Sequence, residues 1–248
     1  MRVEIWSDYV CPFCYIGKRK FESALERFAH KDKLELVYRS FELDPNAPVH
    51  VDYNVHQMLA NKYGMSVEQA KATSSDVARQ AESVGLTYNF DTMVVTNTFD
   101  AHRLSHYAAA QGKAHEMTEA LLYAYFTETK HIGDKEVLAD IAAGVGLNRE
   151  EAAAVLAGSD FTAEVRADEQ EANALGVRGV PFFVINRRYA VSGAQSSEVF
   201  LDTLQKAWDE AYPQLTMVGD AGLTASGDAA CVDGVCAPAA APADAGKK

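Results

Sequence analysis

Residues 2–14 read RVEIWSDYVCPFC and place Cys11 and Cys14 just beyond an expected β-strand. Apolar and polar side chains alternate over residues 2–7, which predicts that strand. Residues 12–30 then carry apolar side chains at helical spacing, and residues 34–39 predict a second strand. These elements form a βαβ unit, with both cysteines where the first strand turns into the helix.

The position of the two cysteines suits disulfide exchange. A thiolate is the nucleophile in that reaction, and the free N–H groups and the dipole at a helix N-terminus favour a thiolate. Pro12 fits the first helical turn because its missing N–H is not needed there. We therefore expect Cys11 to be the more exposed, more acidic, attacking thiol and Cys14 to be the resolving thiol. Half of a zinc site and two unrelated core cysteines are the alternatives, and the βαβ context favours the redox interpretation.

The middle of the chain, from about residue 50 to 175, is expected to be a series of helices, with Gly85 as a stop and another helix over residues 97–111. Ser66 and Gln69 form a capping-box pattern, and Asp134 and Asn148 are suited to begin two later helices. After this block the strand signals return. The predicted order of elements is therefore β-α-β, a helical block, and β-β-α.

The closing elements are two strands at residues 181–186 and 189–191 and a helix at 197–212. Pro181 stands at the entry of the first of these strands. A proline is tolerated as the first residue of a strand, so its position alone is equally consistent with a trans proline that ends a loop.

Composition narrows the classes of partner. The chain has 248 residues, is 48% hydrophobic and 23% charged, and carries a formal net charge of −12, which argues against nucleic acid and anionic membranes as partners. No stretch approaches the roughly 18 apolar residues of a membrane span, and the N-terminal residues do not read as a secretory signal. We therefore expect a cytoplasmic protein, in which close cysteine pairs indicate redox chemistry or metal binding.

The last segment, residues 213–248, is rich in Ala, Gly, Pro and Asp and is expected to be a flexible tail. It contains a second cysteine pair, Cys231 and Cys236, separated by Val-Asp-Gly-Val. Asp-Gly favours a turn, so we expect these two cysteines to form a disulfide. The pair could shuttle electrons to Cys11 and Cys14, staple the tail, or bind a metal ion.

Several of these features resemble the DsbA family of the thioredoxin superfamily. The resemblance is carried by Cys11-Pro12-Phe13-Cys14 after a first strand, by the helical insertion, and by Gly179-Val180-Pro181 before a hairpin. Residues 97–104 (NTFDAHRL), residues 125–128 (YFTE) and the tail cysteines are similar to the FrnE-like branch, which is related to hydroxychromene-carboxylate isomerases. Those isomerases and the kappa-class glutathione transferases have Ser where this chain has Cys11, and DsbA proper usually has His between its cysteines.

The resemblance implies an α/β protein with a thioredoxin-like fold and a large all-helical insertion. The thioredoxin-like domain would comprise residues 1–45 and 176–212, the insertion residues 46–175, and the tail residues 213–248. It also implies that Pro181 is cis and faces the disulfide. Cys231 and Cys236 are the candidate auxiliary redox pair. The residues expected to line the active-site cleft are Trp6, Ser7, Pro12, Phe13, Val180 and His102.

Three polar residues near the site have alternative interpretations. His102 and Arg103 either belong to the wall of the cleft or are simply a packed or solvated helix face. Asp8, close to the cysteines, could help to move protons to or from Cys14. The remaining histidines show no spacing typical of metal ligands.

The expected function is thiol–disulfide exchange or disulfide isomerisation with a protein or low-molecular-weight thiol, with no metal, nucleotide or other cofactor. A glutathione-dependent isomerase or transferase, a redox-independent chaperone, and a metal-binding protein are the alternatives. A monomer and a homodimer are equally compatible with the sequence, and the sequence leaves the substrate and the direction of electron flow open.

Overall fold

The computed structural model describes residues 1–213, together with the backbone of residues 231–232 and 235–236. In the first of these ranges a four-stranded sheet has the order β2-β1-β3-β4. Its strands are β1 (Arg2–Ser7), β2 (Glu35–Ser40), β3 (Phe182–Ile185) and β4 (Tyr189–Ser192). β1 pairs parallel to β2 and antiparallel to β3, and β3 pairs antiparallel to β4. This mixed sheet, joined by α1 and the helical block, is a thioredoxin-like fold.

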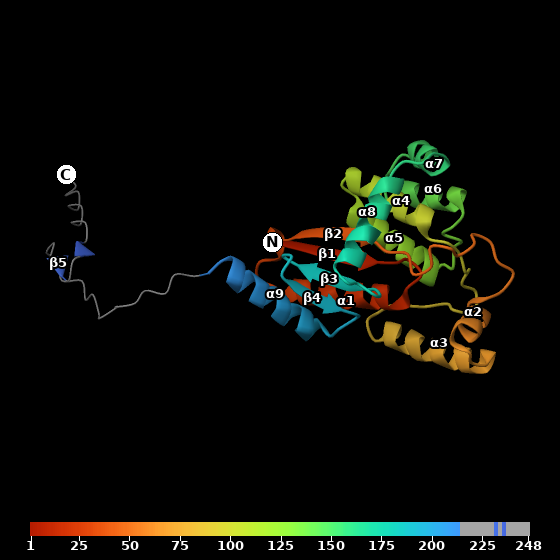
Figure 1. Ribbon diagram of the computed structural model, residues 1–248, viewed down its shortest axis with the longest axis horizontal. Helices are drawn as coiled ribbons and strands as arrows, with labels where there is room; N and C mark the ends of the chain where they lie inside the picture. Colours follow the sequence, from red (N-terminus) through yellow and green to blue (C-terminus); the bar gives the residue numbers. More distant parts are fainter. Residues whose placement is uncertain (214–230, 233–234, 237–248) are drawn as a thin grey trace, which may run out of the picture. The chain divides into compact units, whose positions relative to one another are not determined.

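Two helices, α1 (Pro12–Arg27) and α9 (Ser197–Ala211), lie along one face of the sheet (Figure 1). The core between them and the sheet is aromatic. The ring centroids of Phe21, Phe183 and Phe200 lie between 4.6 and 5.5 Å from one another. Each of these side chains is at most 2% exposed, so α1 is held firmly on the sheet behind the cysteines.

The helical block lies between β2 and β3 in the chain. Its helices are α2 (Val55–Tyr63), α3 (Val67–Glu82), α4 (Phe99–Ala110), α5 (Ala114–Phe126), α6 (Lys135–Gly144), α7 (Arg149–Ala157) and α8 (Thr162–Ala174). Figure 1 shows α4, α5 and α8 on the face of the sheet opposite α1 and α9. Their core includes Leu104, Leu121 and Leu122, and it is continuous with Tyr15 and Ile16 of α1. The block and the start of α1 therefore share one hydrophobic core.

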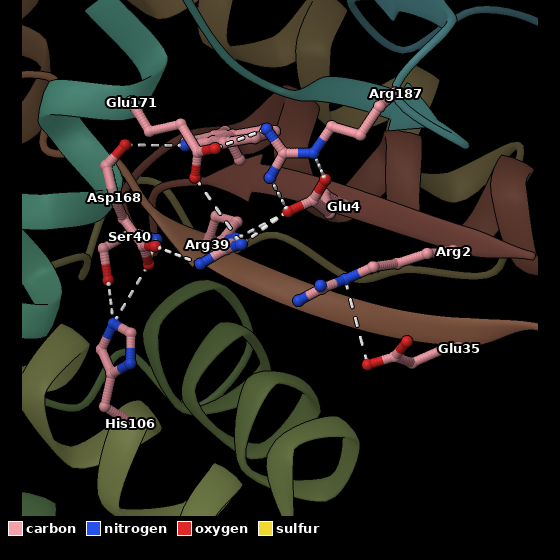
Figure 2. A network of polar contacts seen from close by, with 10 residues as sticks. Arg2, Glu4, Glu35, Arg39, Ser40, His106, Asp168, Glu171 and Arg187 are labelled. Atoms are coloured by element: carbon pink, nitrogen blue, oxygen red, sulfur yellow. Dashed lines mark hydrogen bonds and ion pairs between the residues drawn. The ribbon is translucent and has the colours of Figure 1, made fainter.

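A buried network of charges ties α8 to the sheet (Figure 2). Arg39 of β2 contacts Glu4 of β1 at 2.6 Å and Asp168 of α8 at 2.8 Å, and Arg187 from the β3–β4 turn also pairs with Glu4. Burial alone would raise the pKa of Asp168, but a hydrogen bond from His106, the backbone N–H of Ser40 and the charge of Arg39 lower it below its usual value. Glu4 and Asp168 are 1% and 2% exposed, so this network fixes the helical layer on the sheet.

The limits of the first helix differ from expectation. α1 ends at Arg27 rather than at residue 30, because Phe28 is extended (φ −82°, ψ 120°) and its ring packs edge-on against Trp208 of α9. A 3-10 turn at Lys31–Lys33 then leads into β2.

Residues 83–98, between α3 and α4, contain no helix, and α4 begins at Phe99 rather than at the expected Asn97. The Asn89 N–H instead donates to the Phe126 carbonyl at 2.9 Å, and the Thr127 hydroxyl donates to the Thr87 carbonyl at 2.8 Å. Thr, Asn and Asp side chains in this segment compete with helical hydrogen bonds. The segment therefore runs along the end of α5 as a loop.

The chain divides into two units, Met1–Tyr212 and Pro213–Lys248. The proposed boundaries at residues 45/46 and 175/176 stay predictions. In the second unit, β5 (Cys231–Val232) pairs antiparallel with β6 (Val235–Cys236), and Cys231 stands opposite Cys236. This register agrees with the expected chain reversal, whereas the expected disulfide and metal binding concern side chains outside the described residues. Within the described part of the chain, no helix combines the length and apolarity that crossing a bilayer requires.

Candidate active site

The two cysteines stand at the start of α1, as expected. Cys11 is the N-cap residue and Pro12 the first residue of the helix. The Cys11 N–H donates to the Asp8 carbonyl at 3.2 Å, and the Cys14 N–H donates to the Cys11 carbonyl at 3.0 Å, which fixes the tight turn between strand and helix. Both thiols are free. Phe13 between them is 40% exposed, so this turn reaches the surface.

Cys11 is only marginally more exposed than Cys14, and both cysteines are buried. Cys11 is 4% exposed and Cys14 3%. The Val180 carbonyl lies 3.5 Å from Cys11 Sγ, and Tyr88 hydrogen-bonds the adjacent Pro12 carbonyl at 2.7 Å. These neighbours come from segments distant in sequence, which is why helix position alone did not predict the burial of Cys11.

Burial raises the pKa of the Cys14 thiol well above its usual value, and the hydrogen bond and charge of Cys11 raise it further. The neighbouring Ser7 hydroxyl and Asp8 backbone act in the opposite direction but do not outweigh the burial. Cys14 therefore loses its proton less readily than a free cysteine thiol.

The Val180–Pro181 peptide bond is cis, so the alternative of a trans proline is excluded. The Pro181 carbonyl accepts a hydrogen bond from the Gly193 N–H at 2.8 Å. Gly17 of α1 lies so close to Pro181 that a Cβ there would be 2.9 Å from Pro181 Cγ. The proline is thus wedged between α1 and the β4–α9 connection, beside Cys11.

Asp8 and His102 form a buried pair behind the cysteines. They are 1% and 2% exposed, and His102 Nε2 lies 3.3 Å from Asp8 Oδ1. The other carboxylate oxygen of Asp8 accepts the Leu43 N–H at 2.8 Å, and the His102 ring packs on the ring of Tyr9 with centroids 4.9 Å apart. His102 thus faces the site, whereas Arg103 points away, and its guanidinium binds carbonyls of Val155, Gly158 and Asp160 at the end of α7.

The remaining predicted residues occupy different positions around the cysteines. Ser7 borders a cavity of about 200 Å³ between β2, α4 and α5, together with Tyr9, Ser105 and His102. Trp6 is fully buried, and its indole N–H donates to the Asp168 carbonyl at 3.0 Å, so it supports the site from beneath rather than lining it.

Sequence reasoning missed two residues of the site, Tyr88 and Glu42. Tyr88 belongs to the loop between α3 and α4. Glu42 is 5% exposed and contacts Arg166 at 2.5 Å, and burial raises its pKa while Arg166 and His102 oppose that rise. Neither residue is part of a recognisable local motif. Within residues 1–213, no three His, Cys, Asp or Glu side chains cluster in a way that could hold a metal ion.

Comparison with known proteins shows which family and which solved structures this chain resembles. The family model of the DSBA-like thioredoxin domain matches residues 2–205. A probable DsbA oxidoreductase from Streptomyces coelicolor is 44% identical, with a TM-score of 0.82 over 97% of this chain and 100% of that one.

Two more distant structures share the fold. A 2-hydroxychromene-2-carboxylate isomerase is 15% identical, with a TM-score of 0.65 over 85% of this chain and 98% of that one. The cytosolic disulfide reductase DsbM from Pseudomonas aeruginosa, solved with GSH, is 17% identical, with a TM-score of 0.57 over 85% of this chain and 97% of that one.

Proposed function

Because the chain belongs to the family of DSBA-like thioredoxin domains, we propose that it is a thiol–disulfide oxidoreductase working through Cys11 and Cys14. The observation that carries this proposal is the placement of Cys11 at the N-cap of α1, with Cys14 one turn further on and cis-Pro181 beside them. The free N–H groups of the first helical turn stabilise a thiolate at Cys11.

The exchange proceeds in two steps. The Cys11 thiolate attacks one sulfur of a substrate disulfide, forming a mixed disulfide and releasing the other substrate sulfur as a thiolate. Cys14 then loses its proton and attacks Cys11 Sγ, which releases the second substrate thiolate and leaves a Cys11–Cys14 disulfide. The substrate gains two electrons and the cysteine pair loses two, and the same steps run in reverse oxidise a dithiol substrate.

A protein or a small thiol could supply the substrate sulfur. Phe13 and Leu43 are each 40% exposed, and the Leu43 backbone is bonded to Asp8 next to the cysteines. Apolar side chains at this rim favour an unfolded or extended polypeptide as substrate. A cytoplasmic location is proposed with it, in line with the name of the cytosolic reductase that shares the fold, and cell fractionation with an antibody would test it.

The decisive experiment compares Cys11→Ala and Cys14→Ala in the reduction of insulin by dithiothreitol. We expect Cys11→Ala to lose the activity, because the attacking thiol is gone. Reduced Cys14→Ala, incubated with insulin in the absence of dithiothreitol, should instead accumulate covalent complexes that later addition of dithiothreitol dissociates, because the mixed disulfide cannot be resolved. Full activity of Cys11→Ala would contradict the proposal.

Glutathione-dependent isomerisation is the alternative chemistry, and the same site can test it. A 2-hydroxychromene-2-carboxylate isomerase shares the fold of this chain, and the family resemblance implies Ser at the position of Cys11 in such isomerases. A Cys11→Ser protein that turned over a substrate with glutathione would favour isomerisation. Its inactivity, together with active wild type in the insulin assay, would favour disulfide exchange.

A further inference from the structure

A hollow of about 280 Å³ lies between α3 and the loop at residues 83–98. Its lining includes Ser74, Tyr88, Phe90, Asp91 and Thr92. The volume is just below the roughly 300–1,000 Å³ of pockets that hold drug-sized ligands, so the hollow has room for a side chain rather than for a large cofactor. Any role of this hollow as a substrate subsite rests on the proposed disulfide exchange.

Tyr88 joins the hollow to the cysteines. Its hydroxyl donates to the Pro12 carbonyl at 2.7 Å, and Pro12 is the residue that follows Cys11. Burial raises the pKa of Tyr88, and the charges of Cys11 and Cys14 are among the further causes of that rise. A side chain close to a substrate disulfide at Cys11 is therefore within reach of the hollow.

The hollow carries one carboxylate, that of Asp91, whose side chain is 89% exposed. Asp91 Oδ1 lies 2.9 Å from His56 Nε2, and the Ser74 hydroxyl lies 3.3 Å from His56 Nδ1. His56 and Ser74 are 4% and 3% exposed, so buried contacts fix the position of the carboxylate. A neutral imidazole satisfies both contacts, because it donates at one nitrogen and accepts at the other, and Asp91 then keeps its negative charge.

Two aromatic rings line the same hollow. Tyr88 and Phe90 meet edge to face, with centroids 5.7 Å apart and an interplanar angle of 86°. The Tyr88 ring is stacked on Phe126 with centroids 4.4 Å apart, which holds it in place. The apolar stem of a Lys or Arg side chain packs well on such rings, and the face of a ring attracts the cationic head.

The charge of Asp91 is available to a partner. Within residues 1–213 no Lys or Arg side chain pairs with Asp91, and Arg79 of α3 pairs with Asp76 instead. The whole chain carries a formal net charge of −12, which attracts basic partners over a longer range. Charge complementarity therefore favours a basic side chain over a neutral or an acidic one.

We propose that this hollow is a substrate subsite that receives a Lys or Arg side chain of the polypeptide whose disulfide is exchanged. The cationic head pairs with the Asp91 carboxylate, and the stem packs against Tyr88 and Phe90. The subsite binds the substrate without touching the reacting sulfurs. It therefore selects disulfides that have a basic residue at a set distance from the cysteine.

Single-turnover reduction of matched peptide disulfides tests this proposal. The reduced full chain, freed of dithiothreitol, is mixed by stopped flow with peptides whose single Cys is joined through a disulfide to a fluorescence quencher. Each peptide carries Lys, Gln or Glu at one position. That position is scanned from about one to four residues on either side of the Cys, because an extended chain advances about 3.3 Å per residue. The measured quantity is the second-order rate constant.

We expect the wild type to reduce the best-placed Lys peptide about tenfold faster than its Gln counterpart, because an exposed ion pair and a cation–π contact together contribute on that order. Asp91→Asn should lose this preference, and Asp91→Lys should reverse it in favour of the Glu peptide. Asp202→Asn is the matched control, since it removes the same charge from an exposed position of α9 and should keep the preference.

A Lys preference of equal size at every position, or one that Asp91→Asn retains, would assign the preference to the net charge of the chain and overturn the proposal. The absence of any preference would do the same.

Bis(2-hydroxyethyl) disulfide, which is uncharged, reports on the cysteines themselves, and every variant should reduce it at the wild-type rate. If Asp91→Asn slowed this reaction as much as that of the Lys peptide, Asp91 would have a structural role and the subsite would be refuted. A wild type that reduced neither this disulfide nor any peptide would instead refute the proposed disulfide exchange. The two failures are therefore distinguishable in one experiment.

Discussion

At Gly17 a neighbouring residue, rather than the backbone conformation, leaves no room for a side chain. A Cβ there would lie 2.9 Å from Pro181 Cγ and 3.5 Å from the Ala194 Cα. We expect Gly17→Ala to lower the free energy of unfolding by about 1–3 kcal/mol, the usual range for overpacking, and to slow insulin reduction by displacing Pro181. Urea unfolding and the insulin assay measure the two effects.

Gly144→Ala is the control, because a Cβ at Gly144 meets nothing within 4 Å at the end of α6. It should be neutral or gain up to about 1 kcal/mol from higher helix propensity. If Gly17→Ala matched the wild type in both measurements, the close approach of α1 to Pro181 would be without consequence.

At this scale the sequence predicts residues that belong to a local pattern. Cys11 and Cys14 were identified from the strand-to-helix turn, and Pro181 from its place before a hairpin together with the family resemblance. The contact between Asp8 and His102 spans 94 residues, and no local pattern indicates it. The burial of Cys11 was missed for the same reason, since the Val180 carbonyl reaches it from the far end of the domain.

At the scale of elements, Glu119 holds α5 against α1. Its carboxylate accepts from the Tyr15 hydroxyl and the Lys18 ammonium, each at 2.5 Å, and from Arg19. Burial alone would raise the pKa of Glu119, but these hydrogen bonds outweigh it and bring the pKa to about 2. Because the folded state lowers this pKa, its stabilising effect is complete above the usual value of 4.5 and is lost as the pH falls towards 2.

We therefore expect Glu119→Gln to lower the free energy of unfolding at pH 7 by about 1–3 kcal/mol, partly because Lys18 is left with fewer partners in a buried position. The difference from wild type should shrink as the pH is lowered from 4.5 towards 2 in urea unfolding experiments. Glu26→Gln, a change at an exposed position of α1, should leave stability unaltered at both ends of this range. A pH-independent difference for Glu119→Gln would show that packing rather than charge holds the helices together.

The helices that begin with a clear capping sequence were predicted best. Ser66 and Gln69 form the expected capping box at the start of α3, and Asp134 and Asn148 cap α6 and α7. The course of the loop at residues 83–98 along the end of α5 was not predicted, because its hydrogen-bond partners there lie beyond the reach of a local pattern. Tertiary contacts of this kind override local helix preference.

At the scale of the whole molecule, the second cysteine pair, Cys231 and Cys236, can be tested for a part in disulfide exchange. Cys231 and Cys236 stand opposite each other in the β5–β6 ladder, as a disulfide would require. A tethered thiol pair has an effective concentration on the order of millimolar at its target if the tether can span the distance. We expect a Cys231→Ser, Cys236→Ser double variant to reduce insulin more slowly than wild type with the same dithiol.

The chain truncated after Tyr212 should show the same slower rate and keep the wild-type melting temperature, because Met1–Tyr212 forms a compact unit of its own. Equal rates for all three proteins would rule out electron shuttling by this pair. Loss of a stoichiometric metal ion on truncation would support metal binding by the tail.

The two tryptophans of the chain make opposite faces of the sheet separately observable by fluorescence. Trp6 is sealed beneath α8 by its bond to the Asp168 carbonyl, whereas Trp208 on α9 stacks on the His30 ring with centroids 4.1 Å apart. Replacing Trp208 by Phe would leave a single fluorophore that reports when the helical layer leaves the sheet. The converse Trp6→Phe protein would report when α9 separates from the core. Emission spectra recorded during unfolding would thus reveal whether the two layers come apart together or in sequence.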